Sequence, residues 1–98
     1  METWIKALRS GKYQQAYKGL RKGDGFCCLG LACHVLRPEK LVHTGDDVWM
    51  IDDLAGRLPF WLHRELGINE KIENKLIAMN DDEGKTFAEI ADYLETTN

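Results

Sequence analysis

The feature that most constrains this chain is one continuous apolar segment, residues 26–36, which contains two adjacent cysteines. Within it the apolar positions fit a helix that is apolar on most of its sides. These positions are Cys28, Leu31, Ala32, Val35 and Leu36. Arg37-Pro38 then ends the helix, because a proline disfavours the helical conformation in the residue before it. The rest of the chain is therefore expected to pack around this segment.

Four other segments show helical periodicity. Residues 3–9 place Trp4, Ile5 and Leu8 on one face. A second helix begins at Pro59 and ends at Gly67, and a third is expected over residues 72–79. The terminal helix is the clearest, because a capping box of Thr86 and Glu89 precedes an apolar stripe with the i, i+3, i+4, i+7 spacing. Its members are Phe87, Ile90, Ala91 and Leu94.

Two glycine-containing segments predict turns between short strands. Residues 22–25 (Lys-Gly-Asp-Gly) read as a tight turn after a short strand, and residues 44–47 (Thr-Gly-Asp-Asp) lie between two short apolar stretches. We therefore predict a helix-rich α+β fold with one or two short β-hairpins, with an all-α bundle as the alternative. Residues 1–98 contain no linker or repeat, so a single globular domain is expected.

Composition sets the broad class. At 98 residues, with 44% apolar and 30% charged residues, the chain has the make-up of an ordinary single-core domain. No segment approaches the ~20 apolar residues of a membrane span, and no secretory segment is recognised at the start. Three cysteines, two of them adjacent, make a complete disulfide framework improbable. These observations favour a reducing cytoplasm and no membrane partner.

Charge is distributed unevenly along the sequence. Residues 1–40 hold eight basic and three acidic residues, a balance of +5, and the remainder holds five basic and thirteen acidic residues, a balance of -8. The first part can attract an anion, whereas the second would repel a nucleic-acid duplex. The alternative is that the folded chain mixes the two surfaces and the asymmetry has no function.

Cys27, Cys28, Cys33 and His34 are residue types that bind zinc, but they lack the two ligand pairs that structural zinc sites use. Free cysteines are commonly buried, so these thiols are expected in the core. A cysteine nucleophile would need a nearby base, and His34 lies about two helical turns from the cysteine pair. We therefore predict no metal, no cofactor and no catalytic residue set, and do not expect an enzyme.

Two further segments resemble known motifs, but each lacks a part that the motif requires. Residues 80–84 look like half of a calcium loop, but Ile90 then occupies the position of the bidentate glutamate. Residues 86–94 resemble the first helix of a helix-turn-helix, and the sequence holds no recognition helix after it. Sequence-specific DNA binding is therefore not expected.

The remaining candidate surface lies between Leu8 and Arg21, where cations, hydrogen-bonding groups and aromatic rings alternate. Such a mixture can stack on a base and hold a phosphate. Its members are Arg9, Ser10, Tyr13, Gln15, Tyr17, Lys18 and Arg21. The alternative is that the two tyrosines pack on the core and the basic side chains only cover them.

Three motifs together resemble a known family. They are W-x-x-A-L-R-S-G-x-Y-x-Q (residues 4–15), F-C-C-L-G (residues 26–30), and M-N-D ahead of F-x-E-I-A-D (residues 87–92). In this order they resemble small proteins of tailed bacteriophages and prophages for which we know of no established activity. His34 departs from that pattern, in which an acidic residue often follows the second cysteine block. The resemblance implies expression in the cytoplasm of an infected bacterium and supplies no catalytic residues.

Phage accessory proteins often act by occupying a host or defence component, and this analogy leads to two hypotheses. The first is a counter-defence protein that sequesters a small anionic, nucleotide-like ligand. Arg9, Lys18 and Arg21 would hold phosphate, Tyr13 or Trp4 would stack, and Ser10, Gln15 and Asn80 would orient polar edges. A homo-oligomer could complete the pocket.

The alternative hypothesis is an inhibitor of a host or defence protein. Its acidic face would mimic nucleic acid or enter a basic groove. The residues assigned to that face are Asp46, Asp47, Asp52, Asp53, Asp81, Asp82 and Glu83.

Overall fold

In the computed structural model, which describes residues 1–97, the apolar segment forms the central helix α2, Cys28–Leu36. Every residue from Cys28 to Cys33 is buried. Cys27 caps the helix, and its Sγ accepts a hydrogen bond from the Gly30 amide at 3.3 Å. Trp4 is fully buried against this end, where its Nε1 donates to the Cys28 carbonyl at 2.9 Å. The predicted central element is confirmed.

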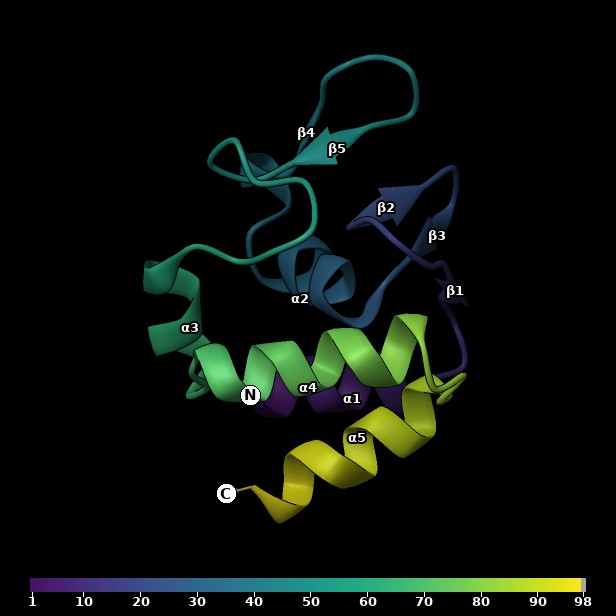
Figure 1. Cartoon of the computed structure of the whole chain (residues 1–98), viewed down its shortest axis with the longest axis vertical. Coiled ribbons are helices and arrows are strands. Elements are labelled where there is room, and N and C mark those ends of the chain that lie inside the picture. The colour runs from purple at the N-terminus through teal and green to yellow at the C-terminus, as the bar shows by residue number, and fades with distance from the viewer. Residues whose placement is uncertain (98) are drawn as a thin grey trace.

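Helices α1 (Glu2–Arg9), α4 (Glu70–Asp81) and α5 (Phe87–Thr96) surround one side of α2. Both α1 and α4 pack against α2 and against α5. Figure 1 shows α5 below α4, and the short helix α3 (Phe60–Leu66) beyond one end of α4. The core is therefore built mostly from helix contacts.

Short strands lie on the other side of α2. Strands β1 (Gln14–Gln15), β2 (Arg21–Lys22) and β3 (Gly25–Phe26) form one sheet in the order β1-β3-β2, with β1 parallel and β2 antiparallel to β3. A 3-10 turn, η1 (Pro38–Lys40), leads to the antiparallel hairpin of β4 (Val42–His43) and β5 (Trp49–Met50). This hairpin projects from the top of the molecule in Figure 1. The α+β prediction with two hairpins is confirmed.

Several local predictions are also confirmed. The Thr86–Glu89 capping box is present at the start of α5, and Gly67 ends α3 in the left-handed conformation at φ 74°. The hairpin turns fall at residues 23–24 and 44–48, where the glycine-containing sequences predicted them. Helix periodicity and turn chemistry were sufficient for these elements.

The structure corrects two boundaries and adds one strand. Phe26 belongs to β3 rather than to the central helix, because its backbone pairs with Arg21 and Gln15. Pro59 is the cap before α3 rather than its first residue. Strand β1 was not predicted at all, because two glutamines carry no apolar alternation and are held by their parallel partner.

The buried stripe of α4 also differs from the prediction. The helix begins at Glu70 and ends at Asp81, so it is longer than the predicted residues 72–79. Its buried positions are Glu73, Leu76, Met79 and Asn80, whereas Ile72 is only half-buried. Two polar residues thus lie on the core face, where apolar periodicity did not place them.

All three cysteines are free and buried, which confirms their predicted place in the core. Burial raises the pKa of Cys27 to about 11 and that of Cys33 to about 12. It raises the pKa of Cys28 well above its usual value. The thiols are therefore protonated at neutral pH. None of the helices within residues 1–97 has the length and apolar character needed to cross a bilayer.

Candidate functional site

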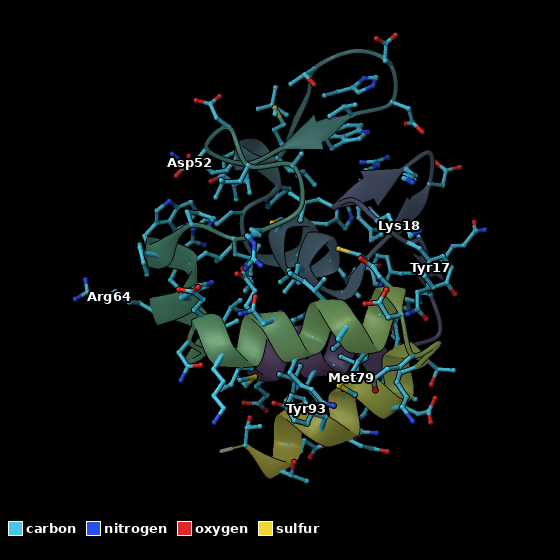
Figure 2. The ribbon with its side chains drawn as sticks, in the orientation of Figure 1. Tyr17, Lys18, Asp52, Arg64, Met79 and Tyr93 are labelled. Carbon is cyan, nitrogen blue, oxygen red and sulfur yellow. The ribbon has the colours of Figure 1, made fainter. Side chains whose placement is uncertain are left out.

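The candidate site is a cleft of about 420 Å³ beside the N-terminal end of α2. Four segments that are distant in sequence form its walls: residues 18–19, 27–29, 55–57, and the face of α4 that carries Ile77, Asn80 and Asp81. In Figure 2, Lys18 lies above the C-terminal end of α4, on the side of the molecule that carries the three-stranded sheet. The cleft lies between the helical and the strand-containing parts of the domain.

A glycine allows the cleft wall to approach α2. A Cβ atom added at Gly30 would lie 1.6 Å from the Leu20 carbonyl oxygen, so no other residue fits there without moving the backbone. That carbonyl accepts from the Cys27 amide at 3.2 Å, while the Leu20 amide donates to Ala55 at 3.2 Å. The F-C-C-L-G motif therefore holds the segment before β2 directly against the start of α2.

Asn80 organises the floor of the cleft. Its Oδ1 accepts from the Cys28 amide at 3.2 Å and from Gln15 Nε2 at 2.8 Å. Its Nδ2 donates to the Ala16 carbonyl at 2.9 Å and to Asp81 Oδ1 at 2.8 Å. These four bonds use the full capacity of a carboxamide, and the side chain is buried. Asn80 therefore positions the surrounding elements and has no group left for a ligand.

Asp81 fixes the backbone that carries Lys18. Its Oδ1 accepts from the Lys18 amide at 2.9 Å, in addition to the bond from Asn80. Lys18 has φ 59°, in the left-handed region that side chains other than glycine seldom occupy. Such a conformation persists where neighbouring contacts determine it. The Lys18 side chain thus starts from a fixed point at the cleft edge.

Arg57 is the second cation that lines the cleft, and a buried carboxyl group holds its guanidinium. Its Nη1 donates to Glu73 Oε1 at 2.9 Å, and the Arg57 side chain is 51% exposed while that of Glu73 is 2% exposed. Glu73 Oε2 also accepts from the Leu58 amide at 2.7 Å and lies 3.0 Å from His63 Nε2. Glu73, which lines a neighbouring hollow and not the cleft itself, therefore anchors both the loop and the Arg57 guanidinium.

The cleft is lined by charged side chains of both signs. Lys18, Arg57 and one acidic side chain, Asp81, line the cleft. Asp81 Oδ1 already accepts two hydrogen bonds, and the Arg57 guanidinium is paired with Glu73. The N-terminal end of α2 adds the positive end of a helix dipole. Cys27 also lines this wall, and its raised pKa, about 11, keeps the thiol neutral because burial disfavours the thiolate. The cleft therefore offers no reactive thiolate at neutral pH.

A smaller hollow of about 170 Å³ adjoins the cleft and shares Lys18, Gly19 and Ala55 with it. Its wall includes Arg21, whose guanidinium lies 4.2 Å from the Trp49 ring centroid and 5.0 Å from that of Phe26.

The stack continues on both sides of the guanidinium. His43 stacks on Trp49 with centroids 4.7 Å apart, and the ring of His34 lies 4.7 Å from that of Phe26. Arg21 thus links the β4–β5 hairpin to the three-stranded sheet through its flat faces. This leaves Lys18 as the cation that serves both hollows.

The predicted site residues do not form one surface. Lys18 and Asn80 meet at the cleft, with Gln15 bonded to Asn80 beneath it. Arg21 lies in the adjoining hollow. Ser10 and Tyr13 instead line a separate hollow of about 430 Å³, which also holds Lys6, Lys12 and His34.

Arg9 and Trp4 are occupied elsewhere. The Arg9 guanidinium pairs with Asp92 at 2.8 Å and with Glu95, and so connects α1 to α5. Trp4 is fully buried and cannot stack on a ligand in this state. The hypotheses of a phosphate contact by Arg9 and a stacking role for Trp4 are not supported by this arrangement.

Sequence reasoning missed Arg57 and Glu73. Arg57 lies in the segment between β5 and α3, which carries no recognisable motif. The available signal was Glu73 itself, which lies three residues before Leu76 and seven before Asn80, on one face of α4. A carboxyl group at a core position needs a donor partner, and a search for that partner would have pointed to nearby arginines.

Comparison with known proteins gives one result. A family model described as a domain of unknown function (DUF8296) matches residues 1–71, which is more than half of the chain. The matched region includes Lys18, the F-C-C-L-G motif and Arg57, and it ends before Asn80. No curated protein and no solved structure matches the chain.

Proposed function

Because the chain belongs to the family described as a domain of unknown function (DUF8296), whose description names no activity, we propose a function from the cleft: the protein binds a small anionic, nucleotide-like ligand there. The observation that carries this proposal is the placement of Lys18 and Arg57 at the N-terminal end of α2. The volume of about 420 Å³ lies within the range of small-molecule sites. Before a ligand arrives, Asp81 fixes the Lys18 backbone and Glu73 holds the Arg57 guanidinium.

In this proposal Lys18 and Arg57 hold a phosphate near the positive end of the α2 dipole. The Cys28 and Gly30 amides keep their bonds to Asn80 and Cys27. Leu29 and Ile77 supply apolar wall for the rest of the ligand. Asn80 and Gln15 act as positioning residues. The protein binds without turning its ligand over, a role that the raised thiol pKa values at the cleft support.

The biological role that we propose is counter-defence in a bacterium infected by a phage. The motif resemblance to phage and prophage proteins supports it, and sequestration of a nucleotide signal requires binding alone. A homo-oligomer in the bacterial cytoplasm is compatible with this role.

The test is thermal stabilisation of the purified chain by mono-, di- and cyclic nucleotides, followed by calorimetry on those that raise Tm. A ligand that binds only the folded state raises Tm in proportion to its concentration relative to Kd. Lys18→Asn removes the charge with a residue that tolerates the left-handed backbone. Loss of one charge-assisted contact should weaken binding by about tenfold.

The matched control is Lys12→Asn, which removes a cation from the separate Ser10–Tyr13 hollow. If Lys12→Asn weakens binding and Lys18→Asn does not, the ligand occupies that hollow and the cleft proposal is wrong. If no nucleotide or inorganic polyphosphate raises Tm, anion binding itself is refuted.

A second candidate function, inhibition of a basic host or defence protein, is favoured by the projecting hairpin. Asp46, Asp47, Asp52 and Asp53 are exposed at its tip and in the turn that follows β5. Asp81, Asp82 and Glu83 lie apart from them at the end of α4 (Figure 1), so the acidic residues form two groups instead of the single predicted face. Binding of a basic protein that falls steeply with salt and is lost in Asp46→Asn/Asp53→Asn would support this function.

A further inference from the structure

Phe60 is the most exposed large apolar side chain within residues 1–97, with 78% of its surface accessible. It is the first residue of α3, and its ring meets the edge of the His63 ring at a centroid distance of 5.8 Å. The energetic cost of leaving a whole aromatic ring in water is large for a small domain. A single exposed apolar side chain is common, but a contiguous exposed apolar surface marks an interaction site.

Two hollows flank this ring. One, of about 660 Å³, is lined by Trp61 and Ile68 among others, and the second, of about 280 Å³, is lined by Leu54 and Pro59 among others. Both hollows include Phe60, so the ring forms the ridge between them. Leu54 is itself 36% exposed and extends the apolar surface. The surface therefore presents a projecting ring and a recess large enough to receive another.

The charges around this surface are balanced. Arg64 and Glu70 both line the larger hollow and both are exposed. Figure 2 shows Arg64 extending from α3 into solvent. In the smaller hollow, Arg57 already pairs with Glu73. A strongly acidic or basic partner would meet one like charge here, whereas a second copy carries the same two opposite charges, so a two-fold arrangement can bring Arg64 of one copy to Glu70 of the other.

We propose that this surface is a two-fold interface between copies of the chain, in which Phe60 of each copy enters the hollow beside Phe60 of the other. Arg64 of each copy then pairs with Glu70 across the axis. A central aromatic ring surrounded by polar residues is the usual arrangement of an interface that depends on few side chains. The proposal does not rest on ligand binding in the cleft.

The test is sedimentation equilibrium of the full chain over a concentration series. The wild-type protein should reach twice the 11.2 kDa mass of the chain. Phe60→Ser should weaken self-association by about 30-fold or more, the effect of losing a central interface ring. Because Phe60 is exposed in the single chain, the variant should keep its circular dichroism and its Tm at low concentration.

The control is Val42→Ser, which removes an apolar side chain that is 55% exposed on β4, away from this surface. It should self-associate like the wild type. The proposal is overturned if the wild type stays monomeric up to about 1 mM, or if the two serine variants behave alike. A dimer that survives Phe60→Ser would likewise place the interface elsewhere.

Charge exchange tests the two-fold geometry. Glu70→Arg should weaken self-association by placing like charges opposite each other, and Arg64→Glu/Glu70→Arg should restore it by exchanging their positions. A double variant that is no stronger than Glu70→Arg would overturn the two-fold arrangement.

Discussion

The two buried polar side chains of α4 hold the two ends of that helix in different ways. Asn80 is neutral and satisfies all four of its hydrogen-bonding positions with groups of the protein. Glu73 instead shares its carboxyl group between a half-exposed guanidinium, a backbone amide and a histidine ring. The Asn80 end has a fixed geometry, whereas at the Glu73 end one of the three partners, Arg57, is half exposed to solvent. One helix thus provides the cleft with a rigid floor and an adjustable wall.

The largest effect is expected when the rigid end is broken. Asn80→Leu leaves the Cys28 amide and the Ala16 carbonyl without their partner in a buried place. We expect a loss of about 3 kcal/mol in the free energy of unfolding, because buried polar groups are costly when unpaired. Urea unfolding followed by circular dichroism measures it. Asn74→Leu, at an exposed position of the same helix, should change stability by less than about 0.5 kcal/mol; equal losses would contradict the assigned role of Asn80.

The reactivity of the thiols near Asn80 is a second test of the contrast between the Asn80 and Glu73 ends of α4. Burial raises the pKa of Cys27 from 9.0 to about 11, so at pH 8 the folded chain should react with iodoacetamide there about 100-fold more slowly than the unfolded chain. The folded state holds this proton more tightly than the unfolded state. The protonated Cys27 thiol therefore makes its full contribution to stability below pH 9, and that contribution is lost as pH rises through about 11.

Mass spectrometry of labelled peptides measures the rates. Asn80→Ala should accelerate labelling by loosening the start of α2, whereas Glu73→Gln should leave it unchanged. Rapid labelling of the native wild type would contradict the closed geometry of this end.

A smaller effect is expected at the adjustable end. Glu73→Gln keeps an acceptor for the Leu58 amide but removes the charge that holds Arg57. We expect a loss of about 1.5 kcal/mol at pH 7, measured by urea unfolding. Glu39→Gln, at an exposed position of η1, is the matched control. If Glu73→Gln were as damaging as Asn80→Leu, the contrast between the two ends would disappear.

The smallest effect is expected at Arg9, which bonds to neither Asn80 nor Glu73. Arg9 pairs with Asp92 and Glu95 on an exposed surface. Arg9→Ala should leave any nucleotide-induced rise in Tm unchanged because Arg9 does not line the cleft, and it should change Tm itself little because surface ion pairs contribute little to stability. A loss of that rise would return Arg9 to the binding site and displace the cleft from it.

Much of the helical half was predictable from short sequence windows. The stripe of α5, its capping box and the glycine after α3 depend on residues within a few positions of one another. Local chemistry decides such elements. The same holds for the burial of the cysteines, which follows from the apolar segment around them.

The cleft was not predictable in the same way. Gln15 and Asn80 are 65 residues apart and Cys28 and Asn80 are 52 apart, yet they share one hydrogen-bond network. Apolar periodicity treats Asn80 and Glu73 as surface residues, because it has no rule for a polar side chain whose partners come from another segment. The residues predicted between Leu8 and Arg21 were adjacent in sequence, but the chain turns at Gly11 and again before β2 and distributes them over different faces.

The guanidinium stack on Trp49 has a consequence for local unfolding. The β4–β5 hairpin shares no strand with the three-stranded sheet, and it meets that sheet through Arg21 and through the Asp47 carboxylate, which accepts from the Gly23 amide at 3.0 Å. Because the strand residues of this hairpin are exposed or half-buried, we expect it to open before the buried core does. Its amide protons should exchange with heavy water well before those of α2, and Arg21→Ala should separate the two exchange rates further.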